Sequence, residues 1–173
     1  MQLSTYIPDY SEFLASRGLV SDGSEESLVI GEQFVPPGRL VEFLERARTV
    51  LRETGAEVIY GTIRAIHRDE TSFLPWARAD FSCVIFNLRT PHTEVGIERT
   101  HETFRKLTDA SLDLGGGFYL TYHRAATASQ VVRAYPRIRE FLTMKERYDP
   151  AGVFQSDWYR HYRRLLAEHE DVL

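Results

Sequence analysis

The chain has 173 residues, 43% of them hydrophobic and 27% charged, and this balance is typical of one soluble globular domain. Its 25 acidic and 21 basic residues give a net charge of -4 and are spread along the whole length, which argues against nucleic acid or an anionic membrane as a partner. The single cysteine, Cys83, lies in an apolar run and fits a buried thiol in a reducing compartment, so we expect a cytoplasmic protein without a membrane span.

The first half of the chain alternates strand and helix signals. Residues 1–24 are expected to form an N-terminal arm. Apolar residues from Leu28 to Val35 predict a strand that ends at two prolines. A helix is expected from Leu40 onward because apolar residues recur at three- and four-residue intervals, and Gly55 is placed to end it.

The following residues predict two strands, a helix and a further strand. Residues 57–66 predict a strand with Ile59 and Ile63 on its core face and Val58, Tyr60, Thr62 and Arg64 on the other. Residues 81–88 predict another strand, and residues 94–113 a helix stopped by the glycines at 115–117. Residues 118–124 then alternate as a strand, with Tyr119, Thr121 and His123 on one side.

This order predicts an α+β, ferredoxin-like antiparallel sheet with both helices on one face, since each crossover packs back on the same side. We assign residues 25–126 to this domain. Residues 127–173 form a C-terminal helical segment, with helices expected over 128–134, 137–148 and 157–168. The arrangement leaves the second face of the sheet without a cover of its own.

Six side chains are predicted to share that face: Tyr60, Thr62, Arg64, Tyr119, Thr121 and His123. Phenols, hydroxyls, an imidazole and a guanidinium suit a polyhydroxylated or anionic small molecule, although an antiparallel sheet also turns polar residues to plain solvent. No histidine pair has metal-ligand spacing, so no metal site is expected. The glycine run lacks phosphate-loop spacing, and no serine motif for acyl transfer is present.

The C-terminal part carries the most specific motif. Residues 141–150 read FLTMKERYDP and residues 154–159 read FQSDWY. This pattern resembles the C-terminal signature of FAD-linked oxidases of the vanillyl-alcohol oxidase type, and residues 60–64, 69–78 and 116–124 resemble the cap domain of the sugar-lactone and alditol oxidase branch. The resemblance covers nearly the whole chain from about Leu28. The N-terminal FAD-binding domain of that family has no counterpart in these residues.

The resemblance implies roles for particular residues. Arg64 matches an arginine that binds substrate and supports the reduced flavin, and Thr62 stands where alditol oxidases have a glutamate. His123 resembles a histidine of the lactone oxidases and is the candidate proton-handling partner. Lys145, Tyr148 and Asp149 match the segment that returns toward the flavin.

The sequence therefore predicts the cap, or substrate-binding, part of an FAD-dependent oxidoreductase acting on CH-OH groups of a hydroxylated or sugar-derived molecule. FAD would be held mainly by a separate domain or subunit, so the isolated chain is expected to be inactive. The alternative is a non-catalytic ferredoxin-like module for binding or homodimer formation.

Overall fold

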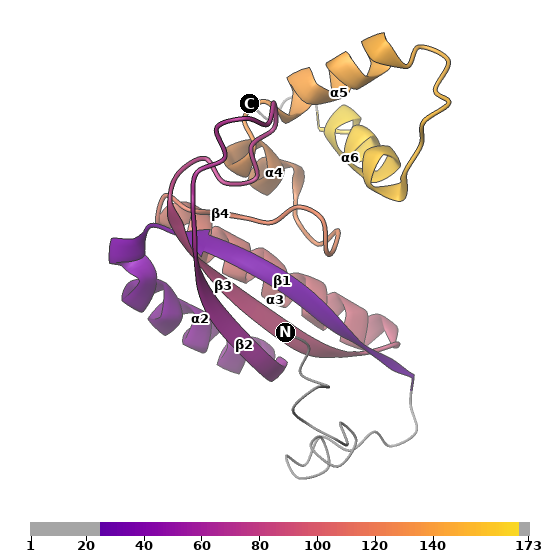
Figure 1. Cartoon of the computed structure of the whole chain (residues 1–173). Coiled ribbons are helices and arrows are strands. Elements are labelled where there is room, and N and C mark those ends of the chain that lie inside the picture. The colour runs from indigo at the N-terminus through magenta and orange to yellow at the C-terminus, as the bar shows by residue number, and fades with distance from the viewer. Residues whose placement is uncertain (1–24, 170–173) are drawn as a thin grey trace, which may run out of the picture.

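A computed structural model describes residues 25–169, and the arm expected over residues 1–24 lies outside them. The fold is built on a four-stranded antiparallel sheet (Figure 1). Its strands are β1 (Glu26–Val35), β2 (Glu57–Ile66), β3 (Phe81–Pro91) and β4 (Gly117–Phe118), in the spatial order β2-β3-β1-β4. The α+β, ferredoxin-like prediction is confirmed.

Two helices cover one face of the sheet. The short 3-10 helix η2 (Pro37–Arg39) leads into α2 (Leu40–Thr54), which ends at Gly55 in the left-handed conformation, with φ of 64°. The second helix, α3 (Glu94–Asp113), is capped by Thr93, whose side chain accepts a hydrogen bond from the Gly96 amide. Buried residues of both helices, of the strands and of the segments that follow α3 and β4 form the main core: Val35, Phe43, Ala47, Val84, Phe86, Leu88, Phe104, Leu107, Ala110, Leu114 and Ala125.

Three further helices lie beyond the end of the sheet that carries β4, away from its faces (Figure 1). They are α4 (Ala128–Ala134), α5 (Ile138–Tyr148) and α6 (Asp157–Ala167). A capping box between Thr127 and Gln130 starts α4. These helices share a second core with Phe118 and Leu120. None of the helices within residues 25–169 is long and apolar enough to cross a membrane.

The strand predicted over residues 118–124 is mostly wrong, because β4 contains only Gly117 and Phe118. One more sheet bond follows, from the Tyr119 amide to the Glu32 carbonyl at 3.0 Å. The next carbonyl, of Leu120, instead accepts hydrogen bonds from the Trp158 indole at 3.2 Å and the Tyr162 hydroxyl at 3.3 Å. The C-terminal helices therefore satisfy the backbone that alternation had assigned to the sheet.

The prediction for β2 is right in its extent and partly wrong in its faces. A register shift between Val58 and Tyr60 places Val58 opposite Leu88, on the side of the helices, instead of with Tyr60. Tyr60, Thr62 and Arg64 remain together on the opposite side. Ile63 does turn toward the helix side but is 52% exposed, because β2 is an edge strand.

Candidate functional site

The face of the sheet opposite α2 and α3 is called the open face here, and Figure 1 looks onto it. No helix among residues 25–169 packs on it. Strand alternation and register assign its residues: Leu28, Ile30, Glu32 and Phe34 from β1, Tyr60, Thr62 and Arg64 from β2, and Cys83, Ile85, Asn87 and Arg89 from β3. The open face thus mixes apolar side chains with a few polar ones.

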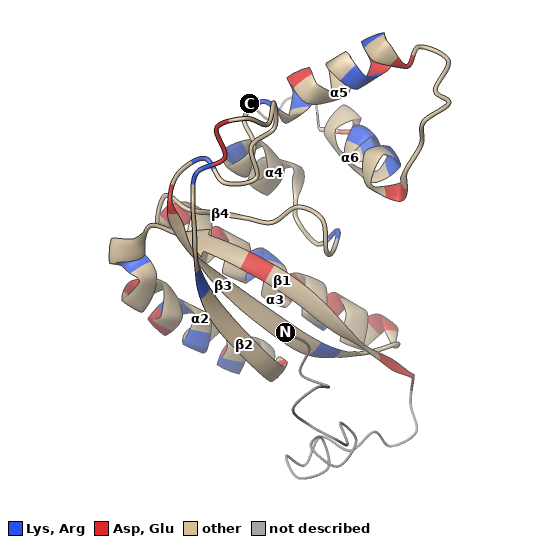
Figure 2. Cartoon of the chain, viewed as in Figure 1, with Lys and Arg blue, Asp and Glu red and all other residues tan. Residues whose placement is uncertain are grey.

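Glu32 lies near the middle of the open face and is only 8% exposed. One carboxylate oxygen accepts a hydrogen bond from the Cys83 thiol at 3.3 Å, and the other accepts one from the Tyr122 hydroxyl at 3.1 Å. Within residues 25–169 no Lys, Arg or His lies within ion-pair distance of this carboxylate. Charged side chains are concentrated on the helices and sparse on the strands (Figure 2), so a buried carboxylate at this place is unusual.

Both donors to Glu32 stay protonated at neutral pH. Burial, reinforced by the nearby Glu32 charge, raises the pKa of the Cys83 thiol to about 12. Burial and the same carboxylate also raise the pKa of the Tyr122 phenol. Each group therefore donates a neutral hydrogen bond. Two hydrogen bonds leave a carboxylate with further lone pairs, so Glu32 can accept more from a bound molecule.

Arg64 supplies positive charge to the same face. It pairs in register with Cys83, and its charge partly offsets the rise in the pKa values of Cys83 and Tyr122, the two groups that donate hydrogen bonds to Glu32. It is exposed and makes no hydrogen bond or ion pair with the residues that the structure describes. Tyr60 and Thr62 lie beside it on β2. The predicted grouping of these three residues is thus found.

Asn87 adds a polar group that has no partner. It lies between Ile30 and Tyr60 in the sheet register and is 3% exposed. Its carbonyl oxygen is buried and accepts no hydrogen bond within the described chain. A buried, unpaired acceptor costs free energy, so Asn87 marks a place where a donor is missing.

The two ends of the open face are closed differently. At one end, the segment between β2 and β3 folds over the sheet, where Trp76 lies edge-on to Phe34 and Tyr119 at centroid distances of 6.0 and 6.3 Å. At the other end, Arg89 pairs with Glu26 at 2.6 Å and with Glu57 at 3.0 Å. Glu32 and Asn87 lie between these two ends.

His123 and Thr121 are not found on the open face. The His123 ring stacks on Phe104 of α3, with centroids 4.1 Å apart, and therefore belongs with the helix side. Burial, with a smaller effect of His101, lowers the pKa of His123 to about 4. Thr121 is exposed in a bend. Of the three open-face side chains predicted from residues 118–124, only Tyr119 is found there, packed against the cluster around Phe34. Tyr122 reaches the same face through its hydrogen bond to Glu32.

Lys145, Tyr148 and Asp149 lie together at the C-terminal end of α5. Figure 1 shows α5 well separated from β2, the strand that carries Arg64. The Lys145 ammonium contacts the Asp149 carboxylate at 2.5 Å, and Asp149 also accepts hydrogen bonds from two loop amides. These two charges therefore hold the loop between α5 and α6. Tyr148, in contrast, is 80% exposed.

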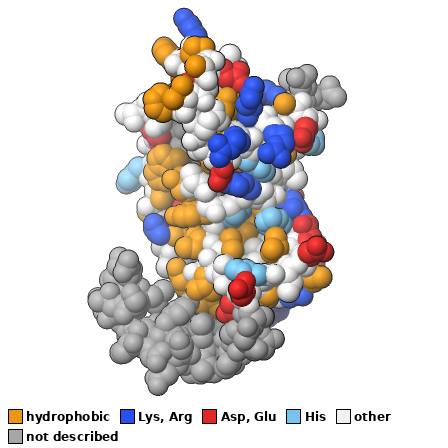
Figure 3. Space-filling view, turned by 90° about the vertical axis from the view of Figure 1, so that its right-hand side faces the viewer, with side chains coloured by type: hydrophobic (Ala, Val, Ile, Leu, Met, Phe, Trp, Pro, Cys, Tyr) orange, Lys and Arg blue, Asp and Glu red, His pale blue; other side chains and the backbone are white. Residues whose placement is uncertain are grey.

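On the side viewed in Figure 3, Lys and Arg side chains gather near the C-terminal helices, and hydrophobic and His side chains lie below them.

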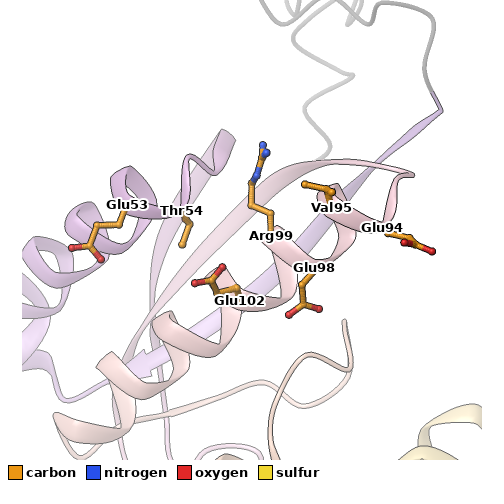
Figure 4. A pocket seen from close by; sticks show the side chains of 7 residues that line it. All are labelled: Glu53, Thr54, Glu94, Val95, Glu98, Arg99 and Glu102. Atoms are coloured by element: carbon orange, nitrogen blue, oxygen red, sulfur yellow. The ribbon is translucent and has the colours of Figure 1, made fainter.

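A shallow cavity of about 510 Å³ lies between α2 and α3. Its lining is acidic and consists of Glu53, Thr54, Glu94, Val95, Glu98, Arg99 and Glu102. Figure 4 shows that these side chains point in different directions and do not converge on one point. Glu102 is also paired with Lys106 at 2.8 Å. This cavity lacks the features of a binding site that the open face has.

Comparison with known proteins gives one informative similarity. Over 65 residues the chain is 35% identical to decaprenylphosphoryl-beta-D-ribose oxidase of Mycolicibacterium smegmatis. The aligned segment is 38% of this chain and only 14% of that oxidase. No protein-family profile matches the chain. The similarity supports a distant relationship to an oxidase, in agreement with the kind of family that the C-terminal motif resembles.

Glu32 and Asn87 were missed by sequence reasoning. Glu32 could have been found, because alternation places it between Ile30 and Phe34 on one face of β1, where a lone carboxylate interrupts an apolar row. Asn87 gives a weaker signal, since only the pairing with Tyr60 and Ile30 shows how deeply it is buried.

Proposed function

We propose that this chain is the cap, or substrate-binding, part of an FAD-dependent oxidoreductase that oxidises a hydroxylated or sugar-derived small molecule. The observation that carries the proposal is the open face, which carries the exposed Arg64, without a partner among residues 25–169, together with a buried carboxylate and a buried amide oxygen that accepts no hydrogen bond within those residues. The distant similarity to an oxidase whose name specifies a ribose substrate supports the same class of reaction and substrate.

The residues on the open face fit a flavin held opposite them. Arg64 has no partner among the described residues, so its guanidinium is available to balance negative charge on a reduced flavin or on a substrate oxygen. Lys145 and Asp149 fit less well, because each already binds the other. We therefore propose that FAD is held mainly by a separate domain or subunit, and that Tyr148 contributes an exposed contact.

Bound FAD would supply the hydride acceptor for a carbon that carries a hydroxyl group. This chain's own residues would position that carbon. Arg64 would orient the hydroxyl oxygen, and Tyr60, Thr62 and Tyr119 would offer further hydrogen bonds. Because Cys83 is fully buried and its pKa is raised to about 12, its thiol would act as a hydrogen-bond donor to Glu32 and not as a nucleophile.

The test is reconstitution. The purified chain is mixed or co-expressed with an FAD-binding domain of the oxidase type, and bleaching of the flavin absorbance is followed with sugars and alditols as substrates. We expect no bleaching by the chain alone and substrate-dependent bleaching in the complex, reduced at least tenfold by Arg64→Ala. A chain that purifies yellow and turns over substrate would contradict the separate flavin domain, and a complex that no hydroxylated substrate reduces would contradict the function.

A second candidate function, a non-catalytic binding or dimerisation module, is favoured by one observation. The loop between α5 and α6 exposes Tyr148, Val153 and Phe154, and Asp149 fixes the loop by accepting hydrogen bonds from the amides of the last two. Exposed apolar side chains on a fixed loop are common at protein contacts. Sedimentation of the purified chain separates the candidates, because a dimer broken by Phe154→Asp supports this module.

A further inference from the structure

We infer that the N-terminal segment of this chain, residues 1–24, packs on the open face and covers β3 between Ile85 and Arg89. The inference concerns an interaction surface and does not depend on the proposed function. It follows from the burial of this part of β3, for which the described residues provide no cover.

The open-face residues of β3 are buried along most of the strand. Ile85 and Asn87 are each 3% exposed, and the side chain of Arg89 is 12% exposed. A sheet face that meets only water leaves such side chains accessible from its outer side. These three residues are therefore covered by protein.

The described elements explain only the burial near β4. There Trp76 packs on Phe34, and the Tyr122 hydroxyl reaches Glu32. Figure 1 shows no described helix in front of the rest of the sheet. The burial of Asn87, further along β3, is thus without a cover among the described residues.

A cover from the same chain accounts for this burial, whereas a partner molecule does not. The exposed fractions are those of a single chain, so neither a second copy nor a flavin domain produces them. Residues 170–173 follow the C-terminal helices, which lie beyond the β4 end of the sheet (Figure 1), and four residues span at most about 14 Å. Residues 1–24 remain as the source of the cover.

The N-terminal segment joins the fold next to the buried part of β3. It leads into β1 at Glu26, which lies opposite Pro91 at the end of the sheet that holds Arg89. From there to the level of Ile85 is six residues of strand, or about 20 Å. Residues 14–24 can span up to about 36 Å, so the residues before them reach all of this part of β3.

The sequence supplies apolar side chains for the contact. Tyr10, Phe13 and Leu14 recur at three- and four-residue intervals and would share one face of a short helix. A helix is about 10 Å wide, or about two strand spacings, so it would cover β3 and leave the outer parts of the neighbouring strands accessible. Leu28 on β1 is 37% exposed, in agreement with a narrow cover.

The cover leaves part of the open face accessible. Thr62 and Arg64 on β2 are exposed and lie outside it. A molecule bound at Arg64 would therefore meet the N-terminal segment as its neighbour along β3.

The experiment measures paramagnetic broadening in nuclear magnetic resonance spectra of the isotope-labelled 173-residue chain. A nitroxide spin label is attached to the Ala15→Cys variant, away from the apolar positions of the segment. The unmodified chain is the control, because the buried thiol of Cys83, with its pKa raised to about 12, should take up no label. We expect strong broadening of the Asn87 backbone amide and weak broadening at Thr49 on the exposed side of α2.

A second variant tests the contact without a label. Phe13→Asp should lower the Tm by about 4–8 °C, as expected when one aromatic side chain is no longer buried. It should also shift the backbone amide signals of Ile85 and Asn87. Ser11→Asp, the matched control, adds the same charge to the segment outside its apolar positions and should change neither property.

The outcomes separate this inference from its alternatives. Equal broadening at Asn87 and Thr49, or none at either, would overturn it, as would a Phe13→Asp variant with unchanged Tm and unchanged amide signals. A mixture of spin-labelled chain and isotope-labelled chain without a spin label tests for a second copy. Broadening of the Asn87 amide in the mixture would assign the cover to that copy and overturn the inference, whereas its absence supports a cover within one chain.

Discussion

The run Gly115-Gly116-Gly117 offers a strong test of how the chain reaches the open face. Gly116 is the critical position, because a Cβ there would lie 1.8 Å from the Phe34 carbonyl oxygen and 2.8 Å from the Ser111 carbonyl oxygen. Both are backbone atoms, and β1 cannot retreat without breaking the pairing of Gly117 with Phe34. Gly116→Ala should therefore cost at least about 3 kcal/mol, the upper range for overpacking.

The two neighbouring glycines are matched controls. Gly115 has a φ of 80° and open space around its Cβ position, so Gly115→Ala carries only the left-handed backbone penalty of about 1 kcal/mol. At Gly117 the nearest atom to a Cβ is 4.0 Å away, and Gly117→Ala should change stability by less than about 0.5 kcal/mol.

Thermal and urea unfolding of the three variants measure these differences. For a chain of this size, about 1 kcal/mol corresponds to about 2–4 °C in Tm. We expect decreases of about 6–12 °C for Gly116→Ala, about 2–4 °C for Gly115→Ala and almost none for Gly117→Ala. If Gly116→Ala is tolerated as well as Gly117→Ala, the close approach of this segment to β1 is not required and the reasoning is refuted.

Three further predictions concern single side chains. His123 has a folded pKa of about 4 and an unfolded pKa near 6.5, so the unfolding free energy should fall by at most about 3 kcal/mol as pH decreases from 6.5 to 4. His123→Phe should flatten this pH profile in urea titrations, and an unchanged slope would contradict the assigned burial. Thr127→Ala removes half of a capping box and should lower stability by about 1 kcal/mol, whereas Ser129→Ala in the same turn should not. Arg64→Ala should change stability by less than about 0.5 kcal/mol, and a larger loss in circular dichroism melts would indicate a structural partner.

Much of the fold could be predicted because its signals are local. The helices α2 and α3 were predicted from apolar periodicity, and their ends from Gly55 and from the glycines after residue 113. The strands β1 and β3 follow from β-branched and aromatic runs bounded by prolines. The order of these elements then left few topologies to consider.

Residues 118–124 show where local signals end. Their alternation is that of a strand, and the structure ends the strand after Phe118. The deciding contacts are the hydrogen bonds to the Leu120 carbonyl from Trp158 and Tyr162, which lie some 40 residues further along the chain. The periodicity of residues 118–124 does not show that a distant helix, and not the sheet edge, binds the Leu120 carbonyl. The position of His123 could therefore not be predicted from that periodicity.

The candidate site was predicted on β2 and missed on the inner strands, for a related reason. Tyr60, Thr62 and Arg64 are polar residues at alternating positions of an edge strand, and such a pattern is readable from one strand alone. Glu32 and Asn87 are notable because they are buried, and their burial depends on the strands on both sides of them. A buried polar group that lacks a hydrogen-bond partner can be recognised only when the strand register is known.

The position of Glu32 also bears on the substrate. The expected resemblance to alditol oxidases would place a glutamate at the position of Thr62, whereas here Thr62 and Glu32 lie on opposite sides of Ile85. Two strand spacings separate them, which is about 10 Å. A carboxylate displaced by that distance toward the middle of the sheet cannot meet the same hydroxyl of the same substrate while Arg64 keeps its place. If the proposed function is correct, the substrate should therefore extend further across the open face than an alditol bound beside Arg64, with its hydroxyls over β1 and β3.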